Sequence, residues 1–373
     1  MARPESAPTT EAERYLSLAL AHESPLEGDL LAVESSLTGF LDQRRRSARS
    51  LSESYVRLWQ SVADACSGGK RLRPRLLLTA FHGFGAPKAR RSAATAASVA
   101  FELLHTALLV HDDVLDNDFA RRGRPNISGT YYDEARAVGA VVHAERRAVS
   151  ASVVAGDLLL HAATDQIARL DIPRALHHEI LDVFDRALFV TAAGELADIA
   201  IATGTQPPSE AQILQMSEEK TAEYSVSAPL IAGALLAGAG PDDIAVLRRY
   251  GAHTGLAFQL GDDLLGIFGD EAITGKSTLS DIREGKETTL IAAARTTPHW
   301  SRLASDFGRT DLSASDGARF ADTLEVCGAR SHVESLLTNN VAAACRIVQQ
   351  SELPPILVTE LVDFAESCIA RVS

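Results

Sequence analysis

The sequence is poor in cysteine. Its 373 residues include four cysteines, and no two are close enough to form a CxxC pair, so neither a zinc site nor a disulfide framework is indicated. We expect free thiols in a reducing cytoplasm. Aromatic residues are also scarce, at 5% of the chain, but 46% of the residues are hydrophobic, which is enough for a large core.

Basic side chains are outnumbered. The chain has 36 Lys and Arg residues against 49 Asp and Glu residues, which gives a formal net charge of -13 at pH 7. A protein with this charge is poorly suited to general nucleic-acid binding, so we expect no nucleic-acid partner. Local basic patches can still bind anionic substrates.

Membrane and export signals are missing as well. The longest weakly polar run, APLIAGALLAGAG from Ala228, is too short and too rich in glycine to span a bilayer. The N-terminal MARPESAPTTEAER has no basic flank followed by an apolar stretch, so it does not resemble a secretory signal. We expect no stable membrane insertion, and a disordered tail over residues 1–10.

Strand-like alternation is rare, whereas helical spacing is common. YVRLWQSVADA, RSAATAASVAFELLHTALLVHDD and SVVAGDLLLHAATDQIARL place apolar residues three and four positions apart. We find neither an internal repeat nor a domain linker. These patterns predict an all-α protein with one domain over residues 11–373, a bundle of roughly ten or more helices. The segment 124–152 is less regular, and we expect its RPNISGTYYDEARAVG portion to be a loop that includes a short helix.

The stretch HDDVLDND, residues 111–118, places four aspartates directly after an apolar helical run. Residues four apart lie about 40° apart around a helix and about 6 Å apart along it, so Asp112 and Asp116 share a face and Asp113 flanks it. Oxygen ligands of this kind suit magnesium, which takes one or two carboxylates and completes its shell with water and substrate phosphates. A solvated acidic helix end is the plainer alternative, although it would oppose the helix dipole.

A second cluster favours the metal hypothesis. AFQLGDDLLGIFGD, residues 257–270, again ends an apolar helix in two aspartates, Asp262 and Asp263, with Asp270 beyond. Two such helices could face each other across a cavity and hold one diphosphate between their metal ions. Asp270 lies eight residues after Asp262, too far along a helix to share its ion, so we leave it out.

Basic motifs could supply the opposing charge. The candidates are GGKRLRP at 68–74, RRGRP at 121–125, EKT at 219–221 and TGKSTLSDIREGK at 274–286. Each alone is an ordinary surface motif. Together, beside two aspartate pairs, they outline a site for two anionic substrates.

These motifs, in this order and over more than half of the chain, resemble the trans-polyprenyl diphosphate synthases. The DDLLG form of the second cluster with a following TGK is similar to an actinobacterial subgroup, which includes geranylgeranyl diphosphate synthases. The resemblance implies the isoprenoid synthase fold, helices around a central cavity, and a homodimer. It also implies a Mg2+-dependent prenyltransferase that joins isopentenyl diphosphate to an allylic diphosphate, with three ions per active site.

The resemblance assigns metal ligands to both aspartate clusters. Asp112 and Asp116 would hold magnesium on the allylic diphosphate, with Asp113 in support. Asp262, and after it Asp263, would hold a further ion from the opposite helix.

The resemblance also implies that three cations contact the allylic diphosphate, namely Arg121, Lys220 and Lys276. The resemblance places Thr221 and Gln259 where oxygen dipoles stabilise developing positive charge, and we count Lys220 with them as catalytic.

Isopentenyl diphosphate would be held by Lys70, Arg73, His105 and Arg122. A lone histidine on an apolar helix face is more often a core residue. The position of His105 upstream of the aspartates favours substrate contact.

The chain departs from the family pattern at two places. Gly266 replaces the third aspartate of the second motif. In GELAD, Glu195 stands where the family usually has glutamine, with Asp198 three residues later. The glutamate weakens any role that the resemblance would give this position.

Product length should depend on the residues beneath Asp112, which are Leu108, Leu104 and, beside them, Ala107. Family members with short products carry aromatic residues just upstream of the first motif, and this chain has none there. One helical turn of about 5.4 Å is close to one isoprene unit. We predict geranylgeranyl diphosphate (C20), with C15 and C25 products as alternatives.

Two other functions remain open. A class I terpene cyclase would share the helical fold and a DDxxD motif, but it needs no isopentenyl site, and we find no clear N-D-x-x-S-x-x-x-E motif. A catalytically silent subunit of a heteromeric prenyl synthase would lose aspartates from one motif, as at Gly266. The intact first motif favours an enzyme.

Overall fold

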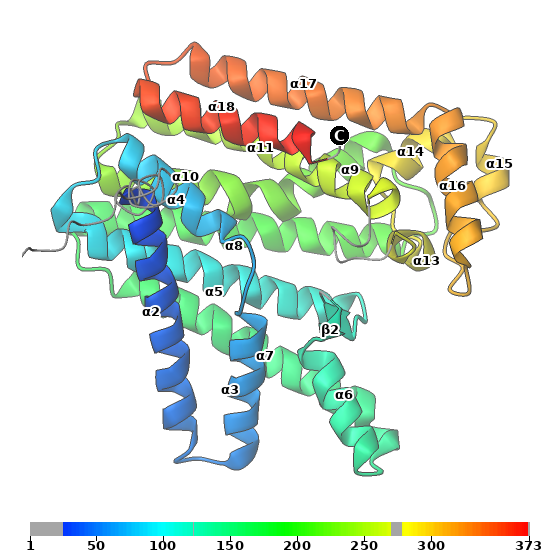
Figure 1. Ribbon diagram of the computed structural model, residues 1–373, viewed down its shortest axis with the longest axis horizontal. Coiled ribbons are helices and arrows are strands. Elements are labelled where there is room, and N and C mark those ends of the chain that lie inside the picture. The colour runs from blue at the N-terminus through cyan, green and yellow to red at the C-terminus, as the bar shows by residue number, and fades with distance from the viewer. Residues whose placement is uncertain (1–24, 122, 270–277, 372–373) are drawn as a thin grey trace, which may run out of the picture.

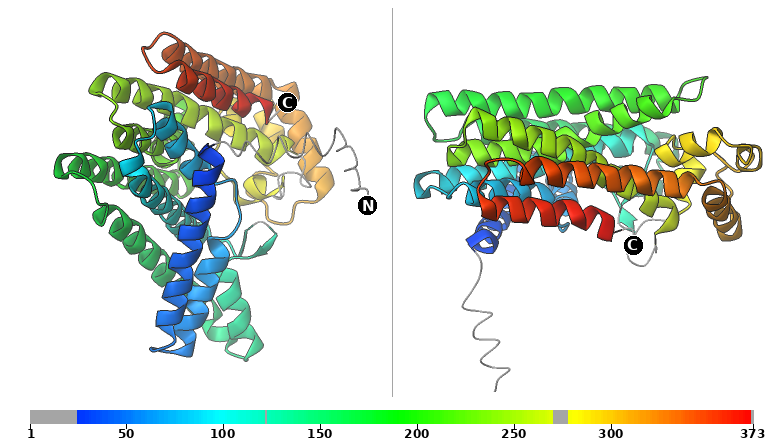
Figure 2. Two further views of the ribbon diagram at one scale, coloured as in Figure 1. Left: turned by 60° about the vertical axis from the view of Figure 1, so that its left-hand side comes forward. Right: turned by 90° about the horizontal axis from the view of Figure 1, so that it is seen from above.

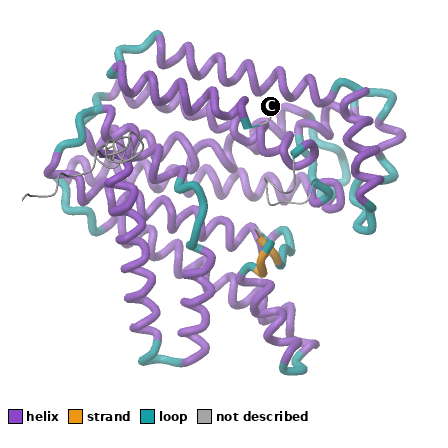
Figure 3. Tube along the Cα trace, viewed as in Figure 1, coloured by secondary structure: helices purple, strands orange, loops and turns teal. Residues whose placement is uncertain are grey.

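The computed structural model describes residues 25–121, 123–269 and 278–371, and these are almost entirely helical (Figures 1 and 3). The two strands in these ranges, β1 (Ala120–Arg121) and β2 (Arg124–Pro125), form one short antiparallel ribbon. The all-α prediction is therefore confirmed. The expected tail over residues 1–10 lies outside the described residues.

The helices before the second aspartate motif account for most of the bundle. They are α2 (Pro25–Ala48), α3 (Glu53–Ala65), α4 (Leu72–Gly83), η1 (Lys88–Arg90), α5 (Arg91–Leu115), α6 (Ile127–Ala137), η2 (Val141–His143), α7 (Ala144–Ala168), α8 (Arg174–Ala202), α9 (Glu210–Ser217), η3 (Glu218–Ser227) and α10 (Ala228–Ala237).

The remaining helices begin with the one that carries this motif. They are α11 (Pro241–Phe268), α13 (Ser280–Glu284), α14 (Thr289–Arg295), α15 (Trp300–Leu303), α16 (Ala314–Val326), α17 (Ala329–Gln349) and α18 (Pro355–Ala370). α17 and α18 lie along α11 in Figure 1.

Helix α5 forms the centre of the bundle and packs against α7, α4 and α2. Its alanines let these neighbours approach closely, and Ala94, Ala97 and Ala100 have no exposed surface. The stretch Lys88–Leu115 is long and apolar enough to cross a membrane, but 72% of its most apolar window is buried inside the fold. Its hydrophobicity is therefore that of a core helix.

Close contact between α10 and α4 explains one glycine of the sequence. A Cβ at Gly233 of α10 would lie 2.0 Å from the Leu77 carbonyl oxygen of α4, so only glycine permits this crossing. One continuous hydrophobic core runs from Val33 on α2 to Cys368 on α18. The bundle thereby fixes α5, α8, η3 and α11, the elements that carry the polar motifs.

The short helix that we expected within RPNISGTYYDEARAVG is present and leaves little of the expected loop. α6 occupies residues Ile127–Ala137, and α7 has begun by Ala144. α6 starts at Asn126, whose side chain accepts a hydrogen bond from the Gly129 backbone N–H at 2.8 Å, a regular N-cap. Figure 2 shows α6 extending from the side of the bundle, near α3.

Candidate active site

The first aspartate motif closes α5. Asp112 and Asp113 lie in its last turn, and Asp116 is the C-cap residue, exposed to solvent. The helix ends there because Asn117 adopts a left-handed backbone with φ 58°. As predicted, an apolar helix presents its carboxylates at one end.

Arg121 returns to these carboxylates from the short β ribbon. Its Nε donates to Asp113 Oδ1 at 2.8 Å, and its Nη2 donates to Asp112 Oδ2 at 3.3 Å. Burial raises the pKa of Asp113 to about 6 even though Arg121 opposes the shift. The ribbon therefore places a guanidinium beside both aspartates.

Lys220 joins α5 to α8. Its Nζ lies 3.0 Å from Asp112, 3.2 Å from Glu195 and 2.6 Å from Asp198. Burial disfavours the ammonium, but the three carboxylates outweigh it, and the pKa of Lys220 is well above its usual value. Burial also works against ionisation of Asp112, yet Lys220 and Arg121 hold the pKa of Asp112 below its usual value.

Lys220 lies on η3, a π-helix. This wide form is rare and is often found at functional sites. Glycines on both neighbouring helices give it room: a Cβ at Gly194 of α8 would lie 2.2 Å from the Lys220 backbone nitrogen, and one at Gly255 of α11 would lie 2.4 Å from Ala222. The packing thus holds a widened helix between α8 and α11.

The second motif lies near the end of α11. Asp263 is almost completely buried and accepts a hydrogen bond from Gln259 Nε2 at 2.9 Å. Gln259 Oε1 in turn accepts one from Thr221 Oγ1 at 2.9 Å. Burial raises the pKa of Asp263 to about 7. The chain Thr221–Gln259–Asp263 connects η3 to α11.

Asp262 faces the C-terminal helix. Its Oδ1 accepts a hydrogen bond from Arg371 Nη2 at 2.7 Å, and the Arg371 guanidinium lies 4.5 Å from the centre of the Phe258 ring. No signal in the sequence indicated this contact, because Arg371 is 109 positions from Asp262.

A chain of contacts connects the two aspartate motifs. Lys220 contacts Asp112, and the adjacent Thr221 reaches Gln259, one turn from Asp263. The charge of Lys286 acts on the pKa of both Asp112 and Asp263. Three other residues considered from the sequence, Arg122, Lys276 and Asp270, lie outside the described residues.

A second set of polar side chains joins α4 to η3. The buried Arg73 donates through Nη2 to Tyr224 OH at 3.1 Å and to Ser225 Oγ at 2.7 Å, and it stacks on the Tyr224 ring. Within the described ranges, its Nε has no hydrogen-bond partner although it is buried. Such a donor suits an anionic ligand.

His105 and Lys70 flank this group differently. His105 Nδ1 lies 3.5 Å from Tyr224 OH. Lys70 is exposed in the turn before α4, where Gly68 and Gly69 both have positive φ, at 71° and 90°. Arg73 and His105 therefore both contact Tyr224, whereas Lys70 lies exposed just before the start of α4.

The donor set fits magnesium that is completed by a phosphate ligand. In the part of the chain that the structure describes, no three Asp, Glu, His or Cys side chains converge to hold a metal ion by themselves. Magnesium is usually bound by one or two carboxylates together with waters and substrate phosphates, and each aspartate motif offers such a pair.

Comparison with known proteins now decides the family. The model of the family described as polyprenyl synthetase matches residues 56–314, more than half of the chain. The chain belongs to the polyprenyl synthetase family. It is therefore, by family, a prenyltransferase, and the resemblance drawn from its motifs is confirmed.

Relatives in this family carry two different product names. A geranylgeranyl diphosphate synthase of Sulfolobus acidocaldarius is 35% identical over 60% of this chain, a match that spans 62% of that relative's length. A (2E,6E)-farnesyl diphosphate synthase of Mycobacterium bovis is 32% identical over 81% of this chain and 80% of its own length.

A solved family structure matches nearly the whole fold. It is geranylgeranyl pyrophosphate synthase from Corynebacterium glutamicum, complexed with isoprenyl diphosphate and magnesium, with a TM-score of 0.86 at 28% identity. The match covers 93% of this chain and 100% of that one. The expected isoprenoid synthase fold is confirmed.

Sequence reasoning missed several residues of this polyprenyl synthetase site. Lys286 was visible only as part of a basic motif, and Glu195 and Asp198 were noted without a role. Tyr224 and Ser225 follow EKT in the sequence, but their inward positions depend on the π-helix.

Proposed function

We propose that this chain condenses isopentenyl diphosphate with allylic diphosphates, head to tail (1'-4), and that its main product is geranylgeranyl diphosphate. The observation that carries the proposal is the continuous set of contacts from Asp112 through Lys220 to Gln259 and Asp263. These contacts join carboxylates, cations and oxygen dipoles from α5, η3 and α11 into one network.

Asp112, Asp113, Asp116, Asp262 and Asp263 would hold the magnesium ions, which we propose number three. When bound, these ions supply Lewis-acid charge to the departing diphosphate. The five carboxylates come from two helices, so they can approach one diphosphate from opposite sides.

Cleavage of the allylic C–O bond leaves diphosphate and a delocalised carbocation. Arg121 and Lys220 lie beside Asp112, where their charge would stabilise the leaving diphosphate, and Lys286 would add to it. Lys276 keeps the role that the resemblance implies. The oxygens of Thr221 and Gln259, which are hydrogen-bonded to each other, would stabilise the cation.

Isopentenyl diphosphate would bind to Lys70, Arg73, His105 and Arg122. The unsatisfied Nε of Arg73 supports this assignment, because a diphosphate oxygen would complete its hydrogen bonds. The isopentenyl double bond then attacks the cation, and the departed diphosphate accepts the proton that is lost. The apolar bundle keeps water from the cation.

Two buried phenylalanines support the C20 assignment. Phe101 lies 11 residues before Asp112 on α5, and Phe184 lies 11 residues before Glu195 on α8. Eleven residues are about three helical turns, so both rings lie beneath the polar site by about 16 Å. They meet edge to face with centroids 5.6 Å apart.

Such a floor limits the allylic chain. At one isoprene unit per turn, the three turns above Phe101 and Phe184 correspond to a C15 starter, and a C20 product would be too long to be extended again. Leu104 and Ala107 are fully buried between this floor and Asp112.

The testing experiment is turnover of labelled isopentenyl diphosphate with dimethylallyl, geranyl or farnesyl diphosphate and Mg2+, with products identified by mass spectrometry. We expect C20 from all three starters. Ala107→Phe should shorten the product to C15 or less, and Phe101→Ala should lengthen it. Incorporation only after a second protein is added would instead favour a silent subunit, and no isopentenyl incorporation at all would favour a cyclase.

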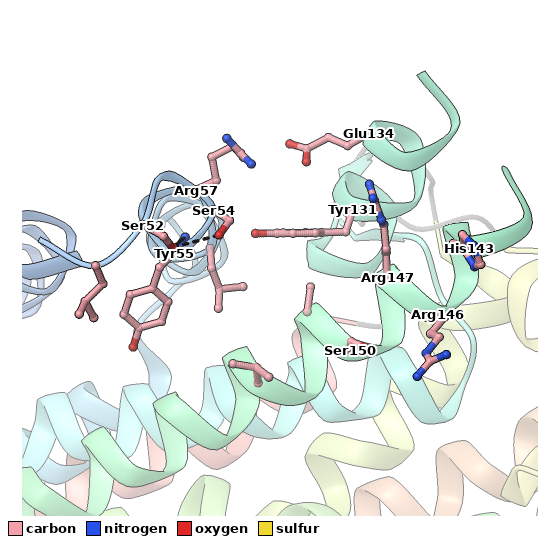
Figure 4. Close-up of a pocket in the computed structure, with 14 residues that line it drawn as sticks. Ser52, Ser54, Tyr55, Arg57, Tyr131, Glu134, His143, Arg146, Arg147 and Ser150 are labelled. Atoms are coloured by element: carbon pink, nitrogen blue, oxygen red, sulfur yellow. Dashed lines mark hydrogen bonds between the residues drawn. The ribbon is translucent and has the colours of Figure 1, made fainter. Parts of the chain in front are cut away.

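We also propose that the chain is a cytoplasmic homodimer. α7 exposes Val149, Val153 and Val154, with 44%, 40% and 47% of each residue accessible. A groove of about 920 Å³ lies between α3, α6 and α7, and Tyr131 points into it (Figure 4). A second copy would cover these apolar groups. Light scattering should give twice the monomer mass, and Val153→Asp should lower it.

A further inference from the structure

Gly266 marks a missing carboxylate in the second aspartate motif. It lies four residues after Asp262 on α11, the spacing at which Asp116 follows Asp112 on α5. Residues at this spacing share a helix face. A carboxylate at position 266 would therefore point toward the same place as Asp262.

Another carboxylate already occupies that place. A Cβ at Gly266 would lie 2.4 Å from Asp281 Oδ2, which is closer than real Cβ contacts allow, and 3.4 Å from Asp281 Cγ. Asp281 belongs to α13, which packs against α11. The absence of a side chain at Gly266 thus makes room for an acidic group from a different element.

The fold fixes Asp281 there. The next residue, Ile282, is 1% exposed, and its carbonyl accepts a hydrogen bond from the Gly308 N–H at 2.8 Å. Arg283 donates through Nη2 to the Leu312 carbonyl. These contacts hold the backbone of α13 in place, and with it the position from which the Asp281 side chain reaches α11.

Asp281 also belongs electrostatically to the active site. Burial opposes the charge on Lys286, and Asp281 and Asp263 together keep the pKa of Lys286 above its usual value.

We infer that Asp281 supplies the second metal-binding face with the carboxylate that Gly266 lacks, so that Asp262 and Asp281, from two different elements, hold one divalent cation together. The inference rests on the proposed function. It makes the pair of Gly266 and Asp281 equivalent to the third aspartate of the first motif.

A purely structural role for Asp281, as counterion of Lys286, is the competing explanation. Manganese binding to the full-length protein with inorganic pyrophosphate, followed by electron paramagnetic resonance, separates the two. Asp281→Asn should weaken one Mn2+ site at least 10-fold, because the loss of a group that only supports a metal ligand already costs about 10- to 100-fold. Gly266→Ala should do the same, because the new methyl group displaces the Asp281 carboxylate while the backbone stays in place.

The matched control is Asp242→Asn, an exposed carboxylate in the first turn of α11, which should leave Mn2+ affinity unchanged. Moving the carboxylate with the double variant Gly266→Asp and Asp281→Gly should restore binding. If Asp281→Asn retains wild-type Mn2+ affinity, or loses its effect when Lys286 is already methionine, the inference is wrong. Failure of wild-type protein to bind Mn2+ with pyrophosphate would instead refute the proposed function.

Discussion

Replacing Lys220 by methionine should destabilise the protein in a pH-dependent way. The change removes the ammonium that contacts Asp112, Glu195 and Asp198, whose side chains are 18%, 21% and 16% exposed. Removing one partner of a buried ion pair costs about 3–5 kcal/mol because the other charge is left uncompensated. Since these groups keep some contact with water, we expect the free energy of unfolding to fall by about 3 kcal/mol at pH 8, the low end of that range.

The loss should shrink at low pH. Burial raises the pKa of Glu195 already in the wild type, and without Lys220 the burial of Asp112 also acts largely unopposed. A carboxyl whose folded pKa lies above its unfolded value of about 4 contributes stability below that value and loses it as pH rises through the folded pKa. The difference in the free energy of unfolding between the wild type and the variant therefore becomes smaller as pH falls from 8 to 5.

Urea denaturation without Mg2+ at pH 5 and pH 8 measures both effects. Lys88→Met, which removes an exposed lysine near the start of α5, is the control and should change little at either pH. An equal loss at both pH values for Lys220→Met would refute the argument, because the cost would then not come from unpaired carboxylates.

Three further changes test the packing and the electrostatics. Asp263→Asn should stabilise the metal-free protein at pH 8 but not near pH 4, because the folded pKa of Asp263 is about 7 and each pKa unit is worth about 1.4 kcal/mol; urea denaturation checks this. Gly194→Ala should lower the melting temperature and weaken pyrophosphate binding, because its Cβ would lie 2.2 Å from the Lys220 backbone nitrogen. Overpacking of this kind costs about 1–3 kcal/mol. Tyr250→Phe should cost about 1 kcal/mol in chemical denaturation, the net value of the hydrogen bond from its hydroxyl to the Leu361 carbonyl at 2.6 Å.

The sequence predicted the helices and both aspartate motifs because these depend on local patterns. The apolar spacing of α5 is visible in residues 91–115, and its acidic end follows directly. The segment after Arg124 was expected to be mostly loop because YYDEARAVG has little apolar periodicity, whereas the Asn126 cap and contacts with α7 extend the short helix over most of it.

The π-helix could not be predicted from residues 218–227. EEKTAEYSVS has the composition of an ordinary helix. Its widened form depends on glycines at 194, 251 and 255, which belong to two other helices and permit close approach. The contacts of Arg371 and Asp281 are likewise tertiary, since each joins α11 to an element whose position only the folded bundle determines.

Charge pairing in the site makes metal and diphosphate binding interdependent. Arg121 and Lys220 now neutralise Asp112 and its neighbours, and they are also the groups proposed to contact the diphosphate. A diphosphate that arrived alone would draw both cations away and leave buried carboxylates unpaired, whereas divalent ions alone would take both carboxylate partners from Arg121 and one of three from Lys220.

When both bind, each charge keeps a partner, so each ligand should raise the affinity for the other. Coupling of this kind is reciprocal in free energy. Pyrophosphate should therefore tighten Mg2+ binding by the same factor by which Mg2+ tightens pyrophosphate binding. Calorimetric titrations in both orders measure the two factors, and independent binding would show that Arg121 and Lys220 do not change partners.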